Sequence, residues 1–202
     1  MMKRLLDIVL SLCGLAVLGP AMLLIAAAIR ATSKGPAIFR QRRVGRGGAS
    51  FEMLKFRSMR TGVDPYGHSP RDGSDPRLTP IGRLLRESSL DELPQLLNVL
   101  RGEMSLVGPR PLYERQAEQW SPRQRRRLEV RPGLTGYAQV YGRGSLTHEE
   151  KIELDLYYVD NRSSWLDCRI ILVTLAGTLL GRGNIYERRY SVRHERETDP
   201  QS

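Results

Sequence analysis

Two adjacent carboxylates in a strongly basic chain are the residues best suited to chemistry. Asp91 and Glu92 lie in the run 90–95 of a 202-residue chain whose formal net charge is +10. Carboxylates in such surroundings can bind a divalent metal that carries phosphates, or can attack a phosphorus atom. Taken alone, the pair is more often a helix cap followed by a first-turn glutamate. The remainder of the chain has to decide between these uses.

A second group of charged residues has features that suit contact with phosphate. Arg110 lies between Pro109 and Pro111, which restrict the backbone on both sides and favour a stiffly held, forked phosphate contact. The alternative for this segment is an ordinary extended loop with a solvated arginine. The remaining candidates are Lys55, Arg57, Arg86, Arg143, Asp155 and Asp167.

Several common site patterns are absent from the sequence. It contains no P-loop, no GxGxxG motif after a strand, and no HExxH or CxxC motif. The three histidines lie in polar segments and are expected at the surface, and Ser88 and Ser89 have no histidine nearby in the sequence, which argues against a serine nucleophile. Cys13 and Cys168 lie far apart in apolar surroundings, so a reducing compartment is expected.

The basic composition points to a polyanionic partner. A sequence pI near 10.1 suits nucleic acid, anionic lipid or phosphorylated small molecules. A basic, membrane-tethered binding protein would explain the charge, but it would not explain an acidic pair between phosphate-seeking arginines. The basic stretches also lack the interleaved aromatic residues that stack single-stranded bases. We therefore expect phosphorylated ligands and no nucleic acid.

The N-terminal segment 8–29 contains no charged side chain and is long enough to cross a bilayer, which takes ~20 residues. Three interpretations compete: a cleaved signal peptide, a spanning helix, and a re-entrant helix pair broken at Gly19 and Pro20. Each half of a broken helix would be ~17 Å long, too short for a hydrocarbon core of ~30 Å. Basic residues flank both ends, so charge gives no clear direction, and composition leaves the re-entrant form only slightly ahead.

The middle of the chain supplies elements that would position the carboxylates. Residues 37–43 and 50–57 read as a hairpin around a glycine-rich turn, and a polar loop at 63–77 precedes a helix that begins at Pro80. A helix is predicted over 92–101 with a leucine stripe at 93, 96, 97 and 100. Because Pro94 must lie in its first turn, Asp91 is expected at or next to the N-cap.

The last third of the chain reads as mainly helical. A basic helical stretch is predicted at 121–129 and a strand at 137–141. Helices are predicted at 147–161, with Ile152, Leu156 and Val159 on one face, and at 165–180. The second of these is strongly apolar but contains Asp167 and Arg169, which favours a place in the core or on a membrane surface.

Taken together, these residues resemble the bacterial sugar transferase family, the small monotopic polyprenol-phosphate phosphoglycosyl transferases. The resemblance runs from about residue 3 to 181, and its several co-ordered motifs make it specific. The matching segments are 3–7 (KRLLD), 35–36 (GP), 41–45 (QRRVG), 55–59 (KFRSM), 78–83 (LTPIGR), 90–95 (LDELPQ), 104–111 (MSLVGPRP) and 131–136 (RPGLTG).

The resemblance implies a helix-dominated α+β fold in a monotopic membrane protein. It favours the re-entrant membrane helix, broken at Gly19 and Pro20, followed by a β-hairpin and a cytosolic helical catalytic domain with surface amphipathic helices. We expect the membrane helix at 1–33, the catalytic domain at 34–183 and a mobile, basic tail at 184–202. The active site would lie on the cytoplasmic face of the bacterial inner membrane, in contact with phospholipid.

The resemblance also implies a reaction. A phosphosugar would pass from a UDP-sugar to polyprenol (undecaprenyl) phosphate, giving polyprenol diphosphate sugar and UMP, as the first membrane step of exopolysaccharide, capsule, O-antigen or glycoprotein glycan assembly. By positional match, Asp91 would be the nucleophile that forms a covalent phosphosugar–aspartyl intermediate, and Asp91 and Glu92 would hold Mg²⁺. Phosphate or substrate contacts would come from Lys55, Arg86, Arg110, Arg143, Asp155 and Asp167, the last two of which alternatively form structural ion pairs.

The transferred sugar, the glycan pathway and the oligomeric state stay open at this point.

Overall fold

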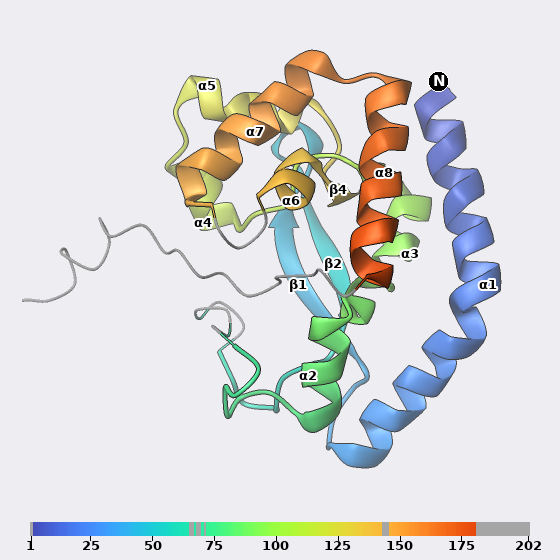
Figure 1. Ribbon diagram of the computed structural model, residues 1–202. Helices are drawn as coiled ribbons and strands as arrows, with labels where there is room; N and C mark the ends of the chain where they lie inside the picture. The colour runs from blue at the N-terminus through green and yellow to red at the C-terminus, as the bar shows by residue number, and fades with distance from the viewer. Residues whose placement is uncertain (1, 65–66, 68–69, 71, 143–145, 181–202) are drawn as a thin grey trace, which may run out of the picture.

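The computed structural model describes residues 2–64, 67, 70, 72–142 and 146–180, which form a helix-dominated α+β unit with two small sheets (Figure 1). The predicted basic tail at 184–202 and Arg143 lie outside the described residues. The elements, in chain order, are α1 (Met2–Thr32), β1 (Ile38–Val44), η1 (Arg46–Gly48), β2 (Ser50–Phe56), α2 (Pro80–Glu87), η2 (Leu90–Glu92), α3 (Gln95–Arg101), β3 (Ser105–Val107), α4 (Glu114–Glu118), α5 (Pro122–Arg125), η3 (Arg126–Glu129), β4 (Gly133–Thr135), α6 (Tyr137–Tyr141), α7 (His148–Asn161) and α8 (Ser164–Leu179).

The N-terminal apolar segment is one helix of 31 residues that continues through Pro20. Its axis changes direction partway along, as expected where proline removes a backbone donor and crowds the preceding turn (Figure 1). The expected interruption is therefore a bend within one helix rather than a gap between two. Among the described residues, α1 is the one helix long and apolar enough to cross a membrane, and only 6% of its most apolar stretch is buried.

Side chains in the first two turns of α1 bind the remainder of the protein. The buried Asp7 carboxylate accepts hydrogen bonds from Ser105 Oγ (2.9 Å) and from the Leu106 amide (3.0 Å). Lys3 Nζ donates to Asp167 Oδ2 at 2.6 Å, which joins the first turns of α1 and α8. The Arg4 guanidinium donates to two carbonyls near the end of α3. The start of α1 is thus fastened to β3, α3 and α8.

The far end of α1 is fastened to the same unit. Ile29 is buried in a cluster with Phe56 of β2 and Leu85 of α2. The Arg57 guanidinium donates hydrogen bonds to the carbonyls of Ser33 (2.9 Å) and Lys34. Arg57, a candidate for chemistry by sequence, therefore holds the chain where it leaves α1. Both ends of the apolar helix contact one body.

The predicted hairpin is confirmed. β1 and β2 are antiparallel, with a register that runs from Ile38 opposite Phe56 to Val44 opposite Ser50. α3 packs against β2 through the buried Asn98, whose carboxamide donates to the Glu52 carbonyl (2.7 Å) and accepts from the Leu54 amide (3.0 Å). The hairpin and the helix behind the carboxylate pair are therefore held in a defined register.

The predicted helix over 92–101 is confirmed, although its α-helical part begins only at Gln95 and its buried face differs from the leucine stripe. The buried residues are Gln95, Leu96, Asn98 and Val99, whereas Leu97 is 38% exposed. The stripe was misleading because the Asn98 carboxamide is used as a backbone partner for β2, which turns a polar position inward.

The predicted strand at 137–141 is wrong, because this segment forms the short helix α6. Tyr137 and Tyr141 are four residues apart, and their rings lie 4.4 Å apart on one side of that helix. The strand of this region is β4, immediately before it, which pairs in parallel with β3. The aromatic residues that suggested a strand are placed by tertiary packing instead.

The remaining predicted helices are confirmed. Thr79 caps α2 by accepting from the Gly82 amide, and Thr147 caps α7 by accepting from the Glu150 amide. The predicted face of α7 is buried, with Ile152 and Leu156 packed against Trp120, and α8 packs through Ile170 on β3. The basic stretch at 121–129 forms α5 and η3.

We predict that Asp7→Ala lowers the free energy of unfolding by about 1–3 kcal/mol, because it leaves the Ser105 hydroxyl and the Leu106 amide without an acceptor. Thermal unfolding of detergent-solubilised protein measures this loss. The matched control is Glu52→Gln, since Glu52 and Arg40 form an ion pair whose side chains are 54% and 68% exposed. A loss no larger than that of the control would show that Asp7 does not anchor α1.

Candidate active site

The carboxylate pair lies in η2, a single 3₁₀ turn between α2 and α3. The prediction of Asp91 at or next to the N-cap of the following helix is therefore corrected: Pro94 takes the N-cap position of α3, and Ser89 precedes the 3₁₀ turn. Ser89 has φ 58°, and among the described residues it is the one non-glycine with a positive φ. This uncommon conformation turns the chain sharply so that Asp91 and Glu92 follow on a separate turn.

Glu92 is held between two cations. Its Oε1 accepts hydrogen bonds from Lys55 Nζ on β2 (2.7 Å) and from Arg110 Nη2 (2.8 Å). The Glu92 side chain is 16% exposed and that of Lys55 is 15% exposed, so both charges are largely removed from water. Burial alone would raise the pKa of Glu92, but Arg110 and Lys55 outweigh it and hold that pKa well below its usual range. Glu92 is therefore a fixed negative charge.

Asp91 has the opposite character. It is 5% exposed, and its carboxylate makes no hydrogen bond or ion pair with the residues that the structure describes. Burial raises its pKa to about 6, while Lys55 opposes this shift and the neighbouring Glu92 charge supports it. Asp91 is thus an unengaged carboxylate beside an engaged one, which is the arrangement that a nucleophile needs.

Arg86 adds a cation on the α2 side of the pair. No hydrogen bond or ion pair joins it to a described residue, and its charge lowers the pKa of Asp91. α2 is held close to the chain before it, because a Cβ at Gly82 would lie 1.8 Å from the Ser58 carbonyl oxygen. The position of Arg86 thus depends on a backbone contact that only glycine permits.

Arg110 reaches Glu92 from a segment packed against β4. A Cβ at Gly133 would lie 2.1 Å from the Gly108 amide nitrogen, so the two backbones approach as closely as glycine allows. The side chain of Arg110 is 44% exposed while it contacts Glu92. An arginine that is rigid at its backbone and exposed at its end is well placed for an external anion.

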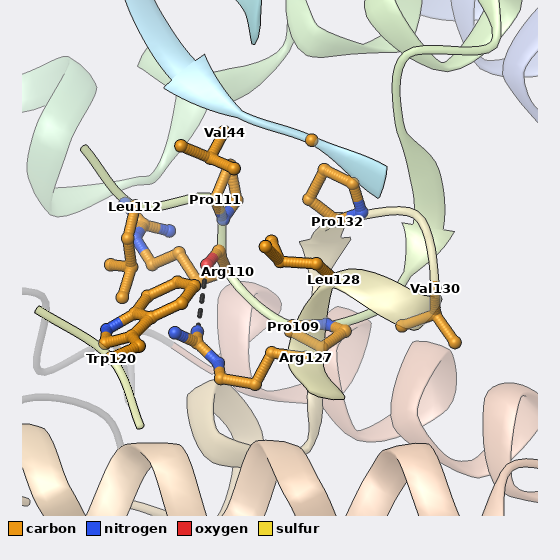
Figure 2. Close-up of a pocket in the computed structure, with 11 residues that line it drawn as sticks. Val44, Pro109, Arg110, Pro111, Leu112, Trp120, Arg127, Leu128, Val130 and Pro132 are labelled. Carbon is orange, nitrogen blue, oxygen red and sulfur yellow. Dashed lines mark hydrogen bonds between the residues drawn. The ribbon is translucent and has the colours of Figure 1, made fainter. Parts of the chain in front are cut away.

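Two arginines near Arg110 were not candidates by sequence. Arg43 of β1 stacks on the ring of Tyr113 with its guanidinium carbon 3.6 Å from the centroid, and burial lowers its pKa to about 10. Arg127 of η3 donates to the Arg110 carbonyl at 3.1 Å (Figure 2). The packing of the hairpin against the loop that carries Arg110 brings both arginines close to it. No spacing in the sequence predicts that packing.

The candidates predicted by sequence therefore separate into three groups. The structure brings Lys55, Arg86 and Arg110 to the carboxylate pair. Asp155 is buried in an ion pair with Arg127, and Asp167 binds Lys3 at the start of α1, so both make structural ion pairs. Arg143 lies outside the described residues.

The oxygen set suits a magnesium ion that arrives with phosphates. Among the residues that the structure describes, no group of three or more metal-binding side chains occurs. Mg²⁺ commonly uses one or two carboxylates together with substrate phosphates and water, which a dedicated protein cage does not require. Asp91 has no hydrogen-bond partner among the described residues, and the hydrogen bonds that Glu92 accepts from Lys55 and Arg110 both fall on Oε1. Asp91 and Glu92 therefore fit such an ion.

The model of the family described as "Bacterial sugar transferase" matches residues 1–181. The chain belongs to this family. It is accordingly an enzyme of the transferase class.

Three relatives illustrate the family. The chain is 44% identical to the galactosyl transferase CpsE of Streptococcus agalactiae serotype III (strain NEM316), covering 90% of this chain and 43% of the relative. It is 43% identical to the sugar transferase EpsL of Bacillus subtilis (strain 168), covering 90% and 89%. It is 45% identical to the UDP-glucose:undecaprenyl-phosphate glucose-1-phosphate transferase of Caulobacter vibrioides, covering 91% and 72%. The chain thus spans under half of the first relative and most of the other two.

We predict that Glu92→Gln lowers the free energy of unfolding by about 1–3 kcal/mol, because it removes the negative charge between Lys55 and Arg110. Chemical denaturation in detergent measures the loss. Adding Lys55→Met should restore part of it, since the double variant no longer leaves Lys55 without a counter-charge. The exposed pair Arg123–Glu153 supplies the control Glu153→Gln, expected within about 0.5 kcal/mol of the parent. Equal effects of Glu92→Gln and Glu153→Gln would contradict this account of Glu92.

Proposed function

We propose that this chain transfers a phosphosugar from a UDP-sugar to undecaprenyl phosphate, with Asp91 as the nucleophile. The observation that carries the proposal is the unequal environment of the two carboxylates, with Glu92 bound by Lys55 and Arg110 and Asp91 left unengaged. The relative from Caulobacter vibrioides bears the name of such a transferase. The names of the relatives mention galactose in one case and glucose in another, so they do not choose the sugar.

The cations around Asp91 address the main obstacle to this reaction. A carboxylate that approaches a diphosphate is repelled unless positive charge offsets both partners. Lys55, Arg86 and Arg110 all lower the pKa of Asp91, so each favours its ionised form. Fixed positive charge of this kind stabilises a transferring phosphoryl group, which is the largest contribution in such reactions.

In the first step, an Asp91 carboxylate oxygen attacks the phosphorus that carries the sugar. An oxygen–phosphorus bond forms, and the bond from that phosphorus to the bridging oxygen breaks. The electron pair leaves on UMP, and the phosphosugar remains joined to Asp91 as an acyl phosphate. Arg110 and Arg86 bind the phosphate oxygens, and Lys55 keeps Glu92 in place.

In the second step, a phosphate oxygen of undecaprenyl phosphate attacks the same phosphorus. The bond to Asp91 breaks, and the carboxylate is regenerated as undecaprenyl diphosphate sugar forms. Division of the transfer into two displacements lets a water-soluble donor and a lipid acceptor use one site in turn. No proton has to enter or leave across the two steps.

Asp91 and Glu92 would hold Mg²⁺ in the working enzyme. When bound, the ion supplies positive charge to the diphosphate and to the departing phosphate. Glu92 orients the site in either case, because its contacts to Lys55 and Arg110 do not require an ion.

The membrane arrangement that suits this reaction keeps both ends of α1 on the cytoplasmic side. The first turn of α1 binds Asp167, and its last turns pack on Phe56 and Leu85 of the same unit. A helix fastened at both ends to one water-facing body enters and leaves the bilayer on one face. The bend near Pro20 would then lie deepest in the lipid.

We predict that Asp91→Asn abolishes both turnover and covalent labelling by a UDP-sugar that carries a tagged sugar, because the amide is a poor nucleophile. Labelling is read by mass spectrometry of the protein after incubation with donor alone. The control Asp160→Asn changes an exposed carboxylate that pairs with Arg126 and should leave both readouts unchanged. Persistent labelling of Asp91→Asn would remove Asp91 as the nucleophile.

We predict that single cysteines at positions 2 and 34 react from the same side of the membrane. Both natural cysteines, Cys13 and Cys168, are exposed and are first replaced by alanine. Met2 is 67% exposed and is preferred to Lys3, whose ion pair with Asp167 anchors α1. A membrane-impermeant maleimide on inverted and right-side-out vesicles measures the reaction. Labelling of the two positions from opposite sides would support a spanning helix instead.

A further inference from the structure

The segment that carries Arg110 is fixed at four consecutive carbonyls. Each accepts a hydrogen bond from a different residue of β1, η3 or β4, so the backbone from 109 to 112 has little freedom to rotate. The donor and acceptor pairs are Gly133 N to Pro109 O at 2.9 Å, Arg127 Nη2 to Arg110 O at 3.1 Å, Arg43 Nη1 to Pro111 O at 3.4 Å, and Val44 N to Leu112 O at 3.0 Å.

The bond to the Arg110 carbonyl comes from a buried ion pair. Arg127 Nη2 also donates to Asp155 Oδ2 at 2.5 Å, and each of these side chains is only 3% exposed. The guanidinium lies over the Trp120 ring with its carbon 4.9 Å from the centroid. Figure 2 shows Arg127 beneath Arg110, pointing at its backbone oxygen. Asp155 is therefore enclosed by protein and does not reach the surface where a substrate would bind.

This ion pair is a costly way to stabilise a fold. Arg127 Nε and Nη1 are buried and have no hydrogen-bond partner within the described residues. The nearby Trp120 Nε1 is likewise buried without a partner there. A buried ion pair commonly adds little stability over apolar residues of similar volume, especially with donors left unpaired. The hydrogen bond that Arg127 donates to the Arg110 carbonyl offers a reason for the presence of this ion pair.

We propose that Arg127 and Asp155 are positioning residues, which direct the Arg110 side chain toward Glu92 and the substrate phosphate by fixing the Arg110 carbonyl. This inference rests on the proposed function. It assigns Asp155 a role through Arg127 and not in contact with substrate. Asp155 orients the Arg127 guanidinium, which binds the Arg110 carbonyl oxygen. The Arg110 guanidinium then contacts Glu92.

The first test replaces the pair without leaving an unpaired charge. Arg127→Met/Asp155→Leu removes both charges together and is expected to fold, because neither partner is left buried alone. We expect kcat/KM to fall roughly 10- to 100-fold, since a small misplacement of a binding group has effects of that size. The matched control is Arg123→Met/Glu153→Gln, an exposed ion pair between α5 and α7, which should stay within about twofold of the parent.

Activity is read as UMP release from UDP-glucose or UDP-galactose, whichever the parent turns over, with undecaprenyl phosphate. Thermal unfolding is recorded for every variant. Arg127→Lys keeps a cation opposite Asp155 but lacks the forked geometry, and it serves if the charge-free pair does not fold. We expect Arg127→Lys to lower kcat/KM less than the charge-free pair does, for the same reason: the Arg110 side chain is misplaced.

The decisive measurement repeats these changes in an Arg110→Ala background. If the pair acts through Arg110, its replacement should cost less than about twofold once the Arg110 side chain is gone. Equal losses with and without Arg110, or full activity of the charge-free pair, would overturn the inference. Full activity of Arg110→Ala alone would instead contradict the proposed role of Arg110, on which the inference depends.

Discussion

The contact of one Glu92 oxygen with both Lys55 and Arg110 is the interaction on which this site depends. It joins three segments that are distant in sequence: strand β2, the 3₁₀ turn η2, and the loop that follows β3. It also pairs Glu92 with two cations, whereas the adjacent Asp91 is left without a hydrogen-bond or ion-pair partner among the described residues. Two neighbouring acidic residues thereby acquire different chemistry from their surroundings alone.

The apolar helix α1 and the site are parts of one framework. Lys3 of α1 donates to the Val107 carbonyl, and Asp7 accepts from Ser105 and Leu106, so α1 fastens β3. The next residue, Gly108, begins the segment that presents Arg110. At the other end of α1, Ile29 packs on Phe56, which follows Lys55. Both cations that hold Glu92 therefore lie within three residues of a contact made by α1.

Local patterns were sufficient to predict the hairpin and the helices α2, α7 and α8, whereas the expectation that Lys55, Arg86 and Arg110 serve one site with the acidic pair came from the family resemblance. They failed where tertiary contacts decide. Tyr137 and Tyr141 form a helix, and Asn98 faces inward because β2 supplies its partners. Asp155 and Asp167 resembled site residues, but their partners Arg127 and Lys3 are visible only in three dimensions. Family motifs supplied the reaction, which composition and spacing did not.

The central claim is that Asp91 carries the phosphosugar between donor and acceptor. The most direct measurement is exchange of radiolabelled UMP into UDP-sugar in the complete absence of undecaprenyl phosphate. A covalent intermediate predicts exchange by the parent protein, because the first step is reversible and needs no acceptor, and it predicts none by Asp91→Asn. A parent protein that turns over with acceptor but shows no exchange without it would contradict the account.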